Sequence, residues 1–79
     1  MMNHDQFPVF LKLANGKSVY RIESERLMVE YQQLGGRWLE HRIEAKILPE
    51  MQLIRDLLDN EHGNVVRIEE DEFKGMLAR

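Results

Sequence analysis

The chain has 79 residues, which is enough for one small domain spanning 1–79 and too few for a second hydrophobic core. It contains no cysteine, which excludes disulfides and thiolate metal sites and leaves a partner as a source of the extra stability that so small a domain often needs. The net charge is -3, with 32% charged residues of mixed sign, and this excludes the strongly basic surface that duplex nucleic acid requires.

A hairpin of two strands is predicted over residues 7–13 and 18–23. Four of the six residues before it are polar, and we expect residues 1–6 to be frayed. In both strands apolar residues recur at every second position, which is the period of a half-buried strand. The dipeptide Asn15-Gly16 favours a two-residue turn, because both residue types tolerate a positive φ. This turn sets Val9 opposite Ile22, Leu11 opposite Tyr20 and Leu13 opposite Ser18.

Two further strands are predicted over 26–33 and 37–44, which extends the hairpin into a four-stranded antiparallel meander. An even loop at Ser24-Glu25 leads into the third strand. For the next connection we choose a three-residue loop over a two-residue turn, because the longer loop pairs apolar side chains with one another. The resulting pairs are Ile22 with Leu27, Tyr20 with Val29, Leu27 with Ile43, Val29 with His41 and Tyr31 with Leu39, whereas the rejected turn would pair Val29 with Arg42.

This register predicts which side chains share a face of the sheet. His41 falls on the inner face and Trp38 on the outer face, so the two do not form one site. Alternation also sends Glu40 and Glu44 to the face opposite His41, which favours a structural histidine bonded to backbone or water. The outer face is expected to carry Phe10, Lys12, Val19, Arg21, Met28, Glu30, Gln32, Trp38, Glu40 and Arg42.

A helix over 49–60, a short fifth strand over 64–69 and a C-terminal helix over 71–78 complete the order ββββαβα of an α+β domain. We expect the first helix to cover the inner face and one face of the sheet to remain uncovered. The fifth strand can join antiparallel beside the first strand or parallel beside the fourth. In the C-terminal helix an apolar side is formed by Phe73, Met76 and Leu77.

No arrangement of residues predicts catalysis. The chain has no cysteine nucleophile, and its two hydroxyl residues of the serine/threonine type, Ser18 and Ser24, have no neighbouring histidine in sequence. The pairs His4-Asp5 and Glu61-His62 supply too few converging ligands for a metal. We therefore predict no catalytic, cofactor or metal site and a protein that is not an enzyme.

The predicted outer face has the composition of an interface, because tryptophan, methionine, phenylalanine and arginine are enriched where proteins meet. Its partner-binding residues are expected to be Phe10, Val19, Arg21, Met28, Trp38 and Arg42. One alternative is a solvated sheet whose aromatic rings lie under arginine stems. Another is a site for single-stranded nucleic acid, in which bases stack on Phe10 and Trp38 and phosphates meet Lys12, Arg21, Arg37 and Arg42.

The interpretation that we carry forward is a non-catalytic domain that docks a protein partner or associates with itself as a homodimer through the outer sheet face around Trp38. The N-terminus has no basic region followed by a long apolar core, and no apolar run approaches the roughly 20 residues that span a bilayer. We therefore expect a cytoplasmic protein that does not enter a membrane.

Overall fold

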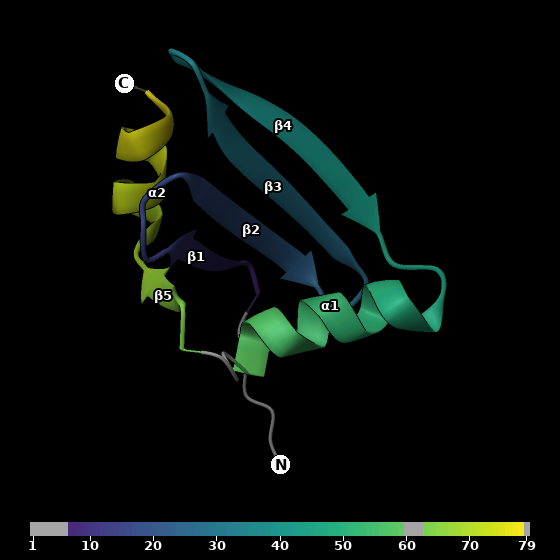
Figure 1. Cartoon of the computed structure of the whole chain (residues 1–79). Helices are drawn as coiled ribbons and strands as arrows, with labels where there is room; N and C mark the ends of the chain where they lie inside the picture. The colour runs from purple at the N-terminus through teal and green to yellow at the C-terminus, as the bar shows by residue number, and fades with distance from the viewer. Residues whose placement is uncertain (1–6, 60–62, 79) are drawn as a thin grey trace.

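The computed structural model of the chain describes residues 7–59 and 63–78, so the fraying expected for residues 1–6 lies outside the described residues. It confirms the α+β architecture: a five-stranded antiparallel sheet with two helices, in the strand order β4-β3-β2-β1-β5 (Figure 1). The elements in chain order are β1 (Val9–Leu13), β2 (Ser18–Ser24), β3 (Leu27–Leu34), β4 (Arg37–Glu44), α1 (Leu48–Asp59), β5 (Val65–Ile68) and α2 (Glu70–Leu77).

The first hairpin has the predicted register, with Val9 opposite Ile22 and Leu11 opposite Tyr20. Its turn is placed one residue earlier than expected, because the N–H of Gly16 donates to the C=O of Leu13 over 2.8 Å. Gly16 takes the positive φ of 76°, which a residue without a Cβ adopts at little cost. The alternation of apolar residues therefore determined the pairing, although the turn type differs.

The predicted register of β3 is wrong by one residue. Ile22 lies opposite Met28, and the pairing shifts between Ile22 and Ser24, where β2 carries an extra residue as a β-bulge. The hydroxyl of Ser24 accepts a hydrogen bond from the N–H of Arg26 over 3.1 Å, which moves the turn toward Glu25 and Arg26. Because side chains alternate along a strand, the shift carries every residue of β3 to the face opposite the predicted one.

The predicted three-residue loop between β3 and β4 is also wrong. Val29 lies opposite Arg42, and Leu34 lies opposite Arg37, so Gly35 and Gly36 alone form the turn, with Gly35 at a φ of 64°. This second one-residue error cancels the first one for β4. Trp38 therefore lies on the outer face and His41 on the inner face, as predicted, while only β3 is inverted.

The inner face of the sheet is covered by α1. The helix buries Ile54 against a cluster that we call the inner core, which also contains residues of β1, β2, β3 and β5. The side chain of Glu50 reaches back to accept the N–H of Lys46 over 2.8 Å, which satisfies a backbone donor before the first turn of the helix. The buried members of the inner core are Val9, Leu11, Tyr20, Ile22, Met28, Ala45, Ile54 and Val65.

The expectation that one face is uncovered is wrong, because α2 packs on the outer face and forms a second cluster, the outer core. The ring of Phe73 lies 4.7 Å from that of Phe10 and 5.6 Å from that of Tyr31. Lys12 Nζ lies 2.7 Å from Glu72 Oε2, which links β1 to the start of the helix. The buried members of the outer core are Phe10, Val19, Ile68, Phe73 and Met76.

The fifth strand joins the sheet antiparallel beside β1, with Phe10 opposite Ile68 and Leu13 opposite Val65. This is the first of the two placements that the sequence left open. The strand leads directly into α2, so β5 carries the helix onto the outer face next to β1. As a result, β5 and β4 are the two edges of the sheet, and α2 has its closest contacts with β1 (Figure 1).

Candidate interaction surface

The edge strand β4 is the most exposed strand of the sheet. It pairs with β3 on one side, and no other strand of residues 7–59 and 63–78 pairs with its second side. None of its eight residues is buried, and only Trp38 and Ile43 are half-buried. Such a strand offers a row of backbone donors and acceptors on which another chain can form hydrogen bonds.

The backbone groups that point away from the sheet belong to alternate residues of β4. The N–H of Ala45 donates to the C=O of Arg26 over 2.7 Å, so Ala45 is directed toward β3. Because bonded and non-bonded pairs alternate along an antiparallel ladder, Ile43, His41 and Leu39 are also directed toward β3. The N–H and C=O groups at the free edge are therefore those of Trp38, Glu40, Arg42 and Glu44.

The two faces of β4 differ in chemistry. Leu39, His41 and Ile43 lie on the inner face, where Leu39 is 40% exposed and Ile43 packs against the inner core. The outer face carries Trp38 and the charged residues at alternate positions after it, and Arg42 Nε lies 3.5 Å from Glu44 Oε2. Both of these charged side chains are more than half exposed, so the ion pair between them contributes little to stability and is free to rearrange.

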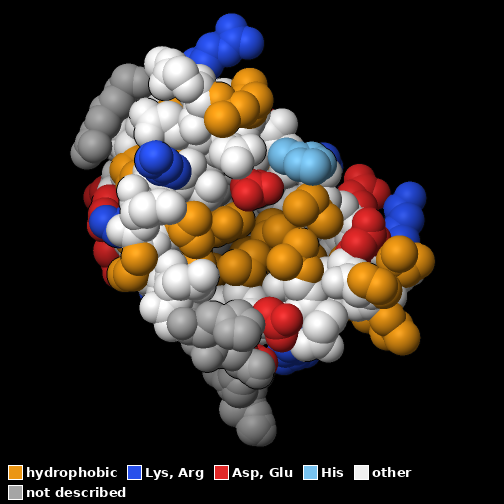
Figure 2. Space-filling view, in the orientation of Figure 1, with side chains coloured by type: hydrophobic (Ala, Val, Ile, Leu, Met, Phe, Trp, Pro, Cys, Tyr) orange, Lys and Arg blue, Asp and Glu red, His pale blue; other side chains and the backbone are white. Residues whose placement is uncertain are grey.

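Large exposed apolar side chains gather along this edge and at its two ends. Leu39 lies on the strand itself, and Leu34 lies next to the β3–β4 turn. Ile47 lies in the connection after β4, and Leu48 is the first residue of α1. In the space-filling view, apolar side chains occupy the middle of the inner face, with a histidine and carboxylates at their border (Figure 2). The apolar surface thus continues from the inner core toward β4.

The structure does not bring the six predicted partner-binding residues onto one surface. Val19 and Met28 are completely buried, and Met28 lies on the inner face because β3 is inverted. Phe10 is buried beneath Phe73. Arg21, Trp38 and Arg42 remain accessible, and only Trp38 and Arg42 belong to β4.

Trp38 lies at the border between the outer core and the exposed edge. It is half-buried and packs against the outer core, so α2 and the rings beneath it cover part of the indole. Phe10 is only 9% exposed, which removes it as a stacking platform beside Trp38. The aromatic surface expected for single-stranded nucleic acid is therefore not formed by these two rings.

One cleft lies on the outer face beside α2, with a volume of about 610 Å³. Its wall includes Arg21, whose Nε lies 2.8 Å from Glu23 Oε2 but is inaccessible to solvent and lacks a well-aligned hydrogen bond. The guanidinium is thus held by charge attraction within its own strand. The other charged residues that line the cleft, Glu70 and Lys74 of α2, form an ion pair of 3.2 Å with each other.

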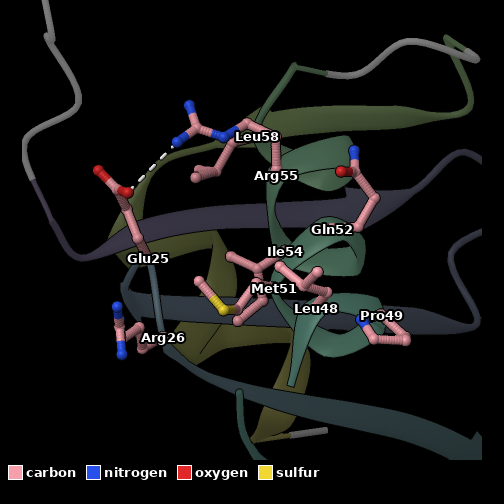
Figure 3. Close-up of a pocket in the computed structure, with 9 residues that line it drawn as sticks. All are labelled: Glu25, Arg26, Leu48, Pro49, Met51, Gln52, Ile54, Arg55 and Leu58. Carbon is pink, nitrogen blue, oxygen red and sulfur yellow. Dashed lines mark hydrogen bonds and ion pairs between the residues drawn. The ribbon is translucent and has the colours of Figure 1, made fainter. Parts of the chain in front are cut away.

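The cleft between α1 and the β2–β3 turn has a volume of about 530 Å³ (Figure 3). Its floor is apolar and includes Met51, Ile54 and Leu58, while Glu25 and Arg55 form an ion pair of 3.2 Å across one side (Figure 3). The cleft has room for an apolar side chain of a partner. Glu25 and Arg55 neutralise each other, and Arg26 adds a positive charge to the lining.

A row of polar side chains crosses the inner face from β2 to β4. Tyr20 lies opposite Glu30, and Glu30 lies opposite His41. Burial raises the pKa of the Tyr20 phenol, and the negative charge of Glu30 raises it further, while a hydrogen bond with Ser18 lowers it. Tyr20 therefore stays protonated at neutral pH and acts as a packed side chain of the inner core.

Within 7–59 and 63–78, no group of three or more histidine and carboxylate side chains converges as a metal site, and the pairs at His4-Asp5 and Glu61-His62 lie outside these ranges. Neither α1 nor α2 has the length and apolar character needed to cross a membrane. Comparisons with protein-family models, curated proteins and solved structures gave no match to this chain.

Sequence reasoning missed the edge itself as a candidate site. The signal was the placement of Leu34, Ile47 and Leu48, which are apolar residues at turns, where solvent normally favours polar ones. Because the turn before β4 and the connection to α1 were treated only as linkers, these residues were not related to one another.

Proposed function

We propose that this domain is a non-catalytic protein-interaction module and that its contact surface is the free edge of β4. The observation that carries this proposal is an eight-residue edge strand without a buried residue in a domain where β1 and β2 are mostly buried. Addition of an extended strand to such an edge is a common mode of protein recognition.

The physical support is the combination of unpaired backbone groups and exposed apolar area. The outward N–H and C=O groups of β4 gain hydrogen-bond partners when a strand is added, without a change in the sheet itself. Leu39 and Leu34 expose apolar surface next to these groups, and its burial stabilises a complex by about 25 cal/mol per Å². Proteins usually protect an edge of this length by covering it, shortening it or placing charged side chains on it, and β4 is charged but neither covered nor short.

The proposed surface retains only part of the outer face around Trp38. α2 occupies that face over β1 and β2, so a partner cannot reach Phe10 or Val19 without displacing the helix. Trp38 instead lines the outer side of the β4 edge, where its exposed part can contact an added strand. Arg42 lies on the same side and provides a charge that a partner can match.

Site-specific photo-crosslinking in the native host tests this proposal. A photoreactive amino acid is placed at Leu39 on β4, and matched controls carry it at Leu53 on α1 and Val66 on β5, which have similar exposed fractions. We expect discrete protein adducts from position 39 and markedly weaker ones from the two control positions. Equal labelling at all three positions, or none at position 39, would contradict a role for the β4 edge.

A further inference from the structure

We infer that the occupant of the β4 edge is a second copy of this chain, paired antiparallel in a register centred on His41. This inference rests on the proposed function and gives that surface a specific partner. Two antiparallel edge strands in one continuous sheet are related by a two-fold axis perpendicular to it, so each face of one copy continues as the same face of the other. Outer residues of β4 must then meet outer residues, and inner residues must meet inner ones.

The charges on the outer face favour a centre at His41 over centres at its two neighbours in the strand. A centre at Ile43 would also pair opposite charges, but it would join only the last residues of β4. A centre at Glu40 would place Glu40 opposite itself, and a centre at Arg42 would place two guanidinium groups opposite each other. A centre at His41 instead places Glu40 of each copy opposite Arg42 of the other, so two ion pairs form by symmetry. The alternation of charge along the strand thus favours one pairing and disfavours its neighbours.

The backbone hydrogen-bond pattern is compatible with this register. The outward-facing N–H and C=O groups belong to Trp38, Glu40, Arg42 and Glu44, and with the centre at His41 each of these residues meets another member of the same set. Glu40 and Arg42 are then hydrogen-bonded partners. The Arg42 guanidinium, now 3.5 Å from Glu44 of its own strand, would lie between that carboxylate and Glu40 of the second copy.

On the inner face this register joins apolar side chains. Leu39 of each copy lies opposite Ile43 of the other, and His41 lies opposite itself at the axis. The apolar surface in the middle of the inner face would continue across the axis into the second copy (Figure 2). The contact would therefore bury Leu39, the most exposed apolar side chain on β4.

The ends of the strand provide a second apolar contact. The chain leaves β4 after Glu44 and presents Ile47 and Leu48, which are 59% and 77% exposed, at the start of α1 on the inner side. In the His41-centred pairing, this segment lies near the β3–β4 turn of the second copy, next to the exposed Leu34 on the same inner side. Residues 7–59 and 63–78 include six large exposed apolar residues. Four of them would thus face the dimer contact, namely Leu34, Leu39, Ile47 and Leu48.

Charge exchange at Glu40 and Arg42 tests the register. Each single variant, Glu40→Arg or Arg42→Glu, places like charges opposite each other at two symmetric positions, and we expect either change to weaken self-association about tenfold or more in analytical ultracentrifugation. The double variant restores opposite charges and should dimerise like the parent. An equimolar mixture of the two single variants should form a heterodimer, because each copy then supplies the charges that the other needs.

The matched control is Arg67→Glu on β5, an exposed charge reversal at the other edge, which should leave association unchanged. A dimer that the double variant fails to restore would overturn the register. If the chain remained monomeric up to about 1 mM, the occupant of the β4 edge would not be a second copy. In that case adducts from Leu39 to a different protein would still support the proposed function, whereas the absence of such adducts would remove both.

Discussion

β2 and β4 have similar alternation of apolar and polar residues, yet β2 is mostly buried and β4 has no buried residue. The difference arises from the covering layers, because both cores centre on β1 and β2 and each has a helix above it. β4 lies two strands away from β2, beyond β3, where neither helix covers it fully. The comparison shows that an apolar alternation identifies a strand but does not determine its burial, which depends on where the helices pack.

The largest expected effect is a loss of stability when the packing of α2 on β1 and β2 is disrupted. Phe73→Ala deletes the ring that contacts Phe10 and Tyr31, and we expect it to lower the free energy of unfolding by about 3–5 kcal/mol. Urea denaturation followed by Trp38 fluorescence measures this loss, since Trp38 packs against the same core.

Lys74→Ala on the exposed side of α2 is the matched control, and its effect should stay within about 0.5 kcal/mol. If Phe73→Ala were as mild as this control, α2 would not be a stabilising cover of the outer face. The contrast between β2 and β4 would then need another cause.

The sequence predicted the order of the elements and most of the sheet. The residues of β2 and β4 lie on the predicted faces, and only those of β3 do not. It could not predict the bulge near Ser24, because that depends on a local hydrogen bond from the Arg26 N–H that competes with regular pairing. The cover by α2 was predictable in part. The apolar side of that helix, with Phe73 and Met76, had to be buried, and the outer face was the one without a partner.

The candidate site was less accessible to sequence reasoning than the fold. Met28 was assigned to the outer face solely through the incorrect register of β3, so a one-residue bulge moved it into the inner core. Trp38 and Arg42 were placed on the correct face because the two register errors cancel at β4. Which strand becomes an uncovered edge follows from the placement of β5 and α2, which pattern alone left open.

An intermediate effect, on self-association, is expected from a change at the centre of β4. In the His41-centred dimer, His41→Lys places two fixed positive charges at the symmetry axis, and we expect self-association to weaken several-fold, which ultracentrifugation measures. The monomer should retain its stability within about 0.5 kcal/mol, because the side chain is exposed and lies opposite the carboxylate of Glu30.

His41→Gln is the neutral control and should associate like the parent chain. Equal association of the lysine and glutamine variants would mean that position 41 does not lie at the axis. That result would move the contact to another register or another part of the edge.

The smallest expected effect is on the pH dependence of stability. It concerns the polar side chains that cross the inner face from β2 to β4. The pKa of Tyr20 is raised above its ordinary value of 10.0 by burial and by the charge of Glu30, so the unfolded chain releases the phenolic proton at lower pH than the folded one. The stabilisation from protonated Tyr20 is therefore complete below pH 10 and is lost as pH rises through the folded-state pKa. Tyr20→Phe should flatten this alkaline decline in urea titrations, and Glu30→Gln should reduce it less, because burial is the larger cause and is retained. If Tyr20→Phe declined as steeply as the parent chain, the phenol would be as well solvated in the folded protein as in the unfolded one, and the inner core would not be closed over β2 as the structure indicates.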